Sequence, residues 1–173
     1  VIVTKFIDKS GKGKATGQIG DGMAEMLGSK LLETNRFIVQ MRLSRDESKQ
    51  TIKGADLLIE GTITEFESGT KSAGVDGGTK ISHVEMIVHV TDAKTGKRLF
   101  SQRVEGKAKD NKGTTGKGGG ELAGVFSPYS KTPMEKAIRI AIEESAKVII
   151  AKTPSEYYRV SSVSSAPPPS STA

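Results

Sequence analysis

The sequence predicts an α/β (α+β) domain in which helices flank a mixed, largely antiparallel sheet. Two segments, at residues 55–66 and 81–92, alternate apolar and polar side chains with a period of two, and a third, at 98–104, resumes an extended pattern after a turn. This period is typical of strands that bury one face. Two other segments, 19–34 and 133–153, repeat apolar residues at the spacing of amphipathic helices. Together the patterns predict the element order β-α-β-(α)-β-β-β-α.

The N-terminal part of the chain begins with an apolar run at residues 1–7 that has the length of a strand. A helix is predicted at 19–34, and Asn35 can end it because asparagine tolerates the left-handed conformation of a helix stop. Residues 37–41 are predicted to form a second strand. The charged stretch 44–50 is predicted to form a short helix.

The central strands have a clear inner and outer face. The predicted inner residues are Leu57, Ile59 and Ile63 in the first strand and Val84, Met86, Val88 and Val90 in the second. The predicted outer residues of the second strand are His83, Glu85, Ile87 and His89. A glycine-bearing turn of hairpin length at 94–97 joins the second strand to the third. We therefore expect one face of this sheet to pack against the helices.

Polar, glycine-rich segments interrupt and follow these elements. We predict polar loops at 67–82 and 106–132. Thr132 is the candidate N-cap of the last helix, and Pro133 is its first residue. The predicted buried stripe of that helix is Met134, Ala137, Ile138, Ala141, Ile142, Ser145, Val148 and Ile149. The Ser/Pro-rich tail at 154–173 is predicted to be disordered, because such a composition cannot bury a core.

Length and composition limit the function classes. The 173 residues fit one domain, predicted at 1–153, with appendages. Because the chain has no cysteine, disulfides, cysteine-based zinc sites and thiol nucleophiles are excluded. No apolar run reaches the ~18 residues of a membrane helix. Much of the net charge of +6 lies in two basic stretches, 9–14 and 107–117, which are either solvated loops or a contact for an anionic surface.

No motif for catalysis or cofactor binding stands out. The glycine-rich stretch 11–17 matches neither the phosphate-loop nor the dinucleotide pattern, and we interpret it as a flexible connector. His83 and Glu85 lie about 7 Å apart on one strand face and could converge on an ion, but His89 lies roughly 20 Å from His83. We therefore predict no catalytic, cofactor-binding or metal-binding residues. We also predict no nucleic-acid partner, because aromatic residues do not interleave the basic ones.

Two parts of the chain carry a family resemblance. Residues 54–68 read GADLLIEGTITEFES and are followed by KSAGV at 71–75. Further on come VEMIVHVTD at 84–92 and TGK at 95–97. In these stretches the chain resembles the CsgG family, which contains the curli secretion channel and related holdfast-anchor proteins. The resemblance implies a lipid-anchored protein without enzymatic activity, located in the periplasm at the outer membrane, with its export signal and anchor N-terminal to this sequence.

Channel members of that family are ring oligomers, in which each subunit contributes two hairpins to a membrane barrel and the loop after the first strand narrows the pore. This sequence departs from the pattern, because its two predicted loops are polar at the positions of those hairpins and the loop at 8–18 is short. An apolar cluster in the second loop is a candidate contact with a partner or the membrane. Its residues are Leu122, Val125 and Phe126.

The resemblance leads to one functional prediction and leaves two alternatives open. We predict a CsgG-like periplasmic lipoprotein domain that is an assembly or accessory component of an outer-membrane secretion or surface-fibre system of curli type. The alternatives are a subunit of a curli-type oligomeric secretion channel and a regulatory lipoprotein that activates a periplasmic cell-wall enzyme. The expected partners are proteins of the cell envelope and the outer membrane, with a ring of identical chains as one arrangement.

Overall fold

The computed structural model describes residues 1–4, 6–11, 18–42, 54–71, 80–109, 126, 129 and 132–159. Its strands are β1 (Ile2–Thr4), β2 (Ile7–Asp8), β3 (Gln40–Arg42), β4 (Leu57–Lys71), β5 (Lys80–Asp92) and β6 (Arg98–Lys109). Its helices are α1 (Gln18–Glu33), α2 (Pro133–Lys152) and the short 3-10 helix η2 (Ser155–Tyr157).

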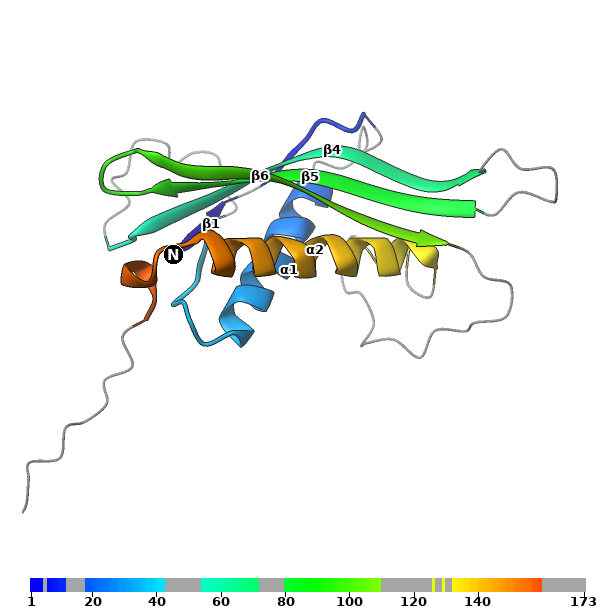
Figure 1. Ribbon diagram of the computed structural model, residues 1–173. Coiled ribbons are helices and arrows are strands. Elements are labelled where there is room, and N and C mark those ends of the chain that lie inside the picture. The colour runs from blue at the N-terminus through cyan, green and yellow to red at the C-terminus, as the bar shows by residue number, and fades with distance from the viewer. Residues whose placement is uncertain are drawn as a thin grey trace, which may run out of the picture.

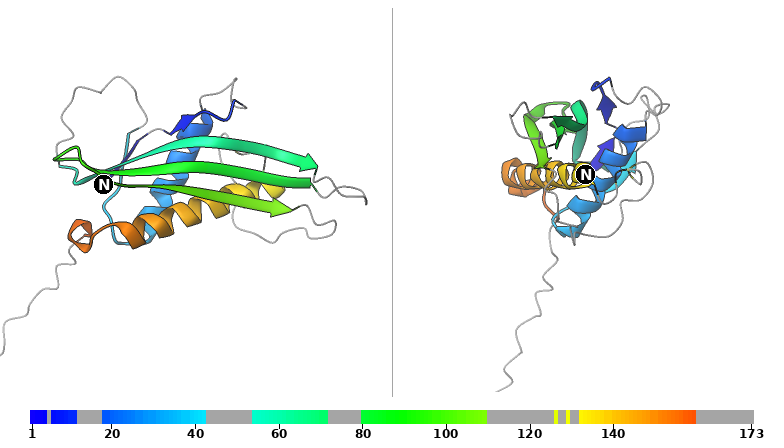
Figure 2. Two further views of the ribbon diagram at one scale, coloured as in Figure 1. Left: turned by 45° about the horizontal axis from the view of Figure 1, so that its top comes forward. Right: turned by 90° about the vertical axis from the view of Figure 1, so that its right-hand side faces the viewer.

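The strands form one mixed sheet. Five of them run in the order β3-β1-β4-β5-β6, and β2 also pairs with β4. β1 pairs in parallel with β3 and β4, whereas β4, β5 and β6 form an antiparallel meander. Figure 1 shows α1 and α2 on the same side of the meander, and the two views of Figure 2 agree. The predicted fold class is therefore confirmed, with both helices covering one face of the sheet.

The core lies between this face and the helices. The inner residues predicted for the first two central strands are all 0 % exposed. α1 adds Met23, Leu27 and Leu31 to the same core. The buried stripe of α2 matches the prediction except that Ala146 is buried, whereas Val148 is only partly buried. Within the described residues, neither helix is both long enough and apolar enough to cross a membrane.

A β-bulge changes the phase of β4. Its register with β5 shifts between Ile63 and Glu65, so Thr64 is an extra residue on the β4 side. Strict alternation would turn Glu65 toward the helices. The bulge instead leaves Glu65 exposed and buries Phe66, which is 3 % exposed.

α2 and β6 approach each other closely at Gly106. A Cβ atom on Gly106 would lie 1.9 Å from the carbonyl oxygen of Ala137 and 2.8 Å from the backbone nitrogen of Ala141. Position 106 therefore has no room for a side chain. Because Gly106 has no side chain, the backbone of α2 packs directly against β6, and this contact helps to hold α2 on the meander.

The strands of the meander are longer than the sequence pattern predicts. β4 extends to Lys71, β5 begins at Lys80 and β6 ends at Lys109. Parts of the loops predicted at 67–82 and 106–132 are therefore strand. The reason is that the backbone hydrogen bonds of an antiparallel pair persist where the side chains are polar. Apart from residues 126, 129 and 132, the rest of both predicted loops lies outside the described residues.

The predicted helix ends hold to within one residue. Asn35 follows α1 with a positive φ of 55°. Thr132 is at the N-cap of α2 with an extended backbone, and Pro133 is the first helical residue. The hydroxyl of Thr132 donates to the carbonyl of Tyr129 and does not cap the helix. The short helix predicted at 44–50 lies outside the described residues.

The C-terminal segment stays attached to the domain beyond α2. The hydroxyl of Tyr157 donates to Oδ2 of Asp92 over 2.8 Å. The backbone amide of Thr95 and then this hydroxyl lower the pKa of Asp92 to about 2. Tyr158 also packs on the core. The disorder predicted from residue 154 is therefore wrong as far as residue 159, because two tyrosines anchor this segment; the remainder of the tail lies outside the described residues.

Candidate functional site

The face of β4–β6 opposite the helices is rich in charged side chains, and we call it the open face. On β5 it carries the four predicted outer residues, all partly exposed. The strand register places Glu65 of β4, Glu85 of β5 and Glu105 of β6 in one row across the sheet. Arg103 and Lys107 lie on either side of Glu105 along β6. The open face therefore gathers charges of both signs from three strands.

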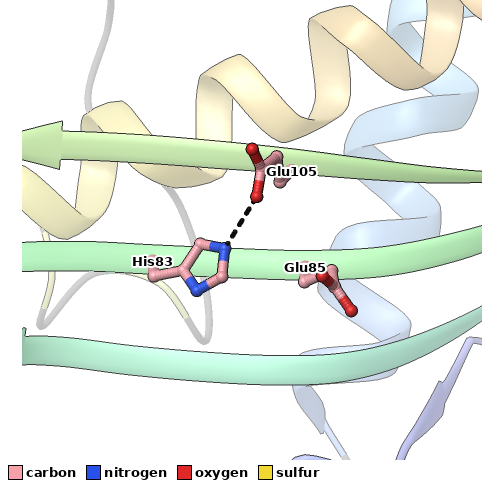
Figure 3. A group of neighbouring side chains, drawn as sticks. All are labelled: His83, Glu85 and Glu105. Atoms are coloured by element: carbon pink, nitrogen blue, oxygen red, sulfur yellow. Dashed lines mark hydrogen bonds and ion pairs between the residues drawn. The ribbon is translucent and has the colours of Figure 1, made fainter.

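His83 lies at the centre of this cluster. Its Nδ1 atom is 2.7 Å from Oε2 of Glu65, and its Nε2 atom is 3.3 Å from Oε2 of Glu105. Figure 3 shows the imidazole ring directed at Glu105 on the neighbouring strand. The His83 side chain is 16 % exposed, whereas both glutamates are about half exposed. The imidazole therefore links carboxylates of β4 and β6 across β5.

Glu85 and Glu105 have further partners on the open face. Oε1 of Glu85 accepts a hydrogen bond from the Thr64 hydroxyl over 2.7 Å and lies 3.6 Å from Nη1 of Arg103. Oε2 of Glu105 is 2.9 Å from Nζ of Lys107. Lys107, and to a smaller extent the imidazole, lowers the pKa of Glu105. The cluster is thus a network of an imidazole, carboxylates and exposed basic groups, which can hold a cation.

His89, the second histidine of the chain, belongs to a separate contact. Its Nδ1 atom is 2.7 Å from the hydroxyl oxygen of Ser101 on β6. Partial burial, together with the nearby charge of Arg98, lowers the pKa of His89. As the strand spacing predicts, His89 does not share a site with His83 and Glu85 in the described part of the chain.

The sequence alone points to His83 and Glu85 but not to the carboxylates on the neighbouring strands. Glu65 reaches the open face only because of the bulge in β4, which leaves no local signal in the sequence. The β5–β6 register pairs Glu105 with Glu85, but it shifts by one residue between Val90 and Thr91, so counting outward from the turn at 94–97 would not find this pair. The pairing of neighbouring strands is therefore the information that the pattern of a single strand lacks.

The predicted contact with a partner or the membrane is wrong for Phe126. This side chain is 2 % exposed, and its ring stacks on Phe66 with centroids 6.4 Å apart. The ring of Tyr129 packs edge-on against the ring of Phe66, with centroids 5.5 Å apart. Phe126 is buried because the bulge in β4 turns Phe66 inward and gives it an aromatic partner. The other two residues of the predicted contact, Leu122 and Val125, lie outside the described residues.

One family model matches this chain. Its description is "Curli production assembly/transport component CsgG", and it matches residues 40–165. The match spans β3 to η2 and so includes the whole open face. No curated protein sequence matches the chain.

Solved structures share the fold at low sequence identity. One is the hypothetical protein CT253 from Chlamydia trachomatis, with a TM-score of 0.57 and 11 % identity over 87 % of this chain and 96 % of that one. Another is protein XCC0632 from Xanthomonas campestris, of family DUF330, with a TM-score of 0.52 and 10 % identity over 86 % of this chain and 83 % of that one. These two likenesses concern the fold. Because the family model matches well over half of the sequence, the chain belongs to the CsgG family.

Proposed function

We propose that this is a CsgG-like periplasmic lipoprotein domain without enzymatic activity. In this proposal it is an assembly or accessory component of an outer-membrane secretion or surface-fibre system of curli type. The observation that carries the proposal is the family match over residues 40–165, whose description names curli production, assembly and transport. The partners would be proteins of the cell envelope, with a ring of identical chains as one arrangement, and a lipid would hold the protein at the outer membrane.

The open face is the surface that we assign to a protein partner. Two of its ion pairs are exposed on both sides: Lys107 with Glu105 and Arg98 with Glu60, separated by 2.9 and 3.7 Å. The exposed Arg103 lies 3.6 Å from Glu85, whose side chain is 13 % exposed. Exposed ion pairs each stabilise a fold by only about 0–1 kcal/mol. The domain can therefore exchange them for contacts with a partner while it stays folded. Charges of both signs in fixed positions also favour one partner over others.

The proposal can be tested in the organism that carries the gene. In cell fractionation, the protein should follow the outer membrane and be released by detergent but not by salt. Deletion of the gene should abolish one secretion or surface-fibre phenotype, and the wild-type gene should restore it. A variant with Arg103→Glu and Lys107→Glu should fold but fail to restore it. The matched control Lys147→Glu, at an exposed position on α2, should restore it fully.

Two outcomes would contradict this proposal. A protein that fractionates with the cytoplasm would exclude a role at the outer membrane. Unchanged secretion and fibres after deletion, together with reduced activity of a periplasmic cell-wall enzyme, would favour a regulatory lipoprotein.

A subunit of a secretion channel is the second candidate, and one observation favours it. β4 extends to Lys71, β5 begins at Lys80, and β6 extends to Lys109. These strand ends reach into the segments where channel members of the family carry their hairpins. Against this candidate, lysine facing lipid costs about 2–4 kcal/mol near the centre of a membrane. Electrical conductance of a lipid bilayer distinguishes the two candidates.

A further inference from the structure

We propose that His83, Glu85 and Glu105 on the open face bind a divalent transition-metal ion such as Zn²⁺. The proposal rests on side-chain geometry and does not depend on a role in secretion. It differs from the sequence prediction, which expects no metal-binding residue, because the structure brings Glu105 and Glu65 to His83 from neighbouring strands.

The spacing of the ligand atoms suits a tetrahedral ion. Zinc binds imidazole nitrogen and carboxylate oxygen at about 2.0–2.2 Å, so two ligand atoms of a tetrahedral site are about 3.3–3.5 Å apart. Nε2 of His83 and Oε2 of Glu105 are 3.3 Å apart. One ligand atom from each of His83, Glu85 and Glu105 lies within 4.8 Å of the others. A change of the Glu85 rotamer would bring its oxygen to the shorter distance, and a water could complete the tetrahedron.

His83 is already held as a metal-binding histidine usually is. Such histidines donate their second ring N–H to a carboxylate or carbonyl, which fixes the tautomer and the ring orientation. Oε2 of Glu65 lies 2.7 Å from Nδ1 of His83 and can accept that hydrogen bond. The lone pair of Nε2 then points toward Glu105, in the direction seen in Figure 3. Glu65 belongs to β4, so this support is separate from the ligands on β5 and β6.

The backbone fixes the relative positions of the three ligands. Glu85 is paired directly with Glu105 across the β5–β6 ladder, and His83 lies two residues along the same face of β5. Directly paired residues have Cα atoms about 4.5–5.5 Å apart, and residues two apart on one strand are about 7 Å apart. Sites built on strands hold their ligands more precisely than sites on loops. Binding therefore requires side-chain rotation and little ordering of the main chain.

Two basic side chains compete for the same carboxylates, and both can give way. Lys107 is 2.9 Å from Glu105 and is 56 % exposed, and Arg103 is 3.6 Å from Glu85 and is 66 % exposed. The Lys107–Glu105 pair, exposed on both sides, contributes about 0–1 kcal/mol, and Arg103 approaches the more buried Glu85 only to 3.6 Å. Both side chains can therefore turn into solvent at small cost. With a neutral imidazole, the carboxylates of Glu65, Glu85 and Glu105 outnumber the two basic groups, so the cluster attracts a cation.

The ligand set selects the class of ion. Ca²⁺ takes about 6–8 oxygen ligands, and Mg²⁺ prefers oxygen and keeps several waters. Imidazole suits zinc and other first-row transition ions, and a carboxylate can complete such a site. We therefore choose Zn²⁺ as the probe and Mg²⁺ as the negative probe.

The experiment is isothermal titration of Zn²⁺ into the purified chain, produced without a histidine tag, stripped with chelator and dialysed at neutral pH. We expect one equivalent of zinc to bind. His83→Ala and Glu105→Gln should each weaken binding by about tenfold or more. Glu65→Gln, which disturbs only the orientation of the imidazole, should weaken it by about tenfold. Zinc should also raise the melting temperature of the wild type but not that of His83→Ala.

His89→Ala is the matched control, because it removes the other histidine from the same strand and the same face. Its zinc affinity should equal that of the wild type, and Mg²⁺ should produce no binding heat. Circular dichroism without zinc checks each variant's fold, and His83→Gln replaces His83→Ala if the latter does not fold. No zinc binding by the wild type would overturn the proposal. Equal affinity of the wild type, His83→Ala and Glu105→Gln would show an adventitious ion only and would overturn it too.

Discussion

Replacement of Gly106 by alanine should destabilise the domain, although alanine is ordinarily the better residue in a strand. The new Cβ would lie 1.9 Å from the carbonyl oxygen of Ala137, and that oxygen is part of the α2 backbone. α2 would have to withdraw by about 1.5 Å before this contact reached an ordinary 3.4 Å. Overpacking of this kind costs about 1–3 kcal/mol, and the strand preference of alanine offsets about 0.5–1 kcal/mol of it. We expect a net loss of about 1 kcal/mol in the free energy of unfolding.

Urea denaturation followed by far-UV circular dichroism measures this loss from the midpoint and slope of the transition. In a thermal melt, a loss of about 1 kcal/mol corresponds to a fall of about 2–4 °C for a domain of this size. The control Lys109→Ala, at an exposed position on β6, should stay within about 0.5 kcal/mol of the wild type. Without the contact, Gly106→Ala would stabilise the strand. A variant as stable as the wild type, or more stable, would therefore refute the close packing of α2 on β6.

Three further predictions test other parts of the structure. Phe126→Ala should cost about 3–5 kcal/mol in a denaturation curve, because the side chain is 2 % exposed in the core; a change below about 0.5 kcal/mol would place it on the surface. Ile142→Ala should cost about 2–5 kcal/mol, whereas Lys147→Ala, exposed on the same helix, should be neutral in the same assay. The third concerns Asp92, whose pKa is lowered from 3.8 to about 2 in the folded state, so its contribution is present above pH 3.8 and is lost as the pH falls toward 2. Between pH 3.8 and about 2, the melting temperature of the wild type should therefore fall more steeply than that of Tyr157→Phe. A difference in melting temperature that does not change with pH would contradict the hydrogen bond from Tyr157 to Asp92.

The fold class could be predicted because a period-two pattern reports burial directly. The inner residues from Leu57 to Ile63 and from Val84 to Val90 alternate without interruption and are buried as expected. The change of phase after Ile63 could not be predicted in this way, since a bulge is decided by how two strands pair. The ends of the strands were missed for a related reason. Backbone hydrogen bonds to a neighbouring strand hold polar residues that show no apolar pattern of their own.

The candidate site could be predicted only as far as one strand reaches. His83 and Glu85 are two residues apart, so their common face follows from the pleat. Glu105 joins them through the register of the β5–β6 hairpin, and Glu65 joins them through the bulge. The burial of Phe126 likewise depends on Phe66, which lies far away in the sequence. Contacts between strands and between distant segments therefore account for what the local pattern does not contain.

Single-channel conductance in a planar lipid bilayer tests the central claim most directly. The claim is that the chain is an accessory or assembly component and does not itself form a pore. The protein should be produced from its full gene in a host that lipidates it, and it should be added to the bilayer over a range of concentrations. We predict no steady conductance steps. Steady steps that disappear when residues 110–120 are deleted, in a variant that keeps the circular dichroism of the wild type, would contradict the claim and establish a channel.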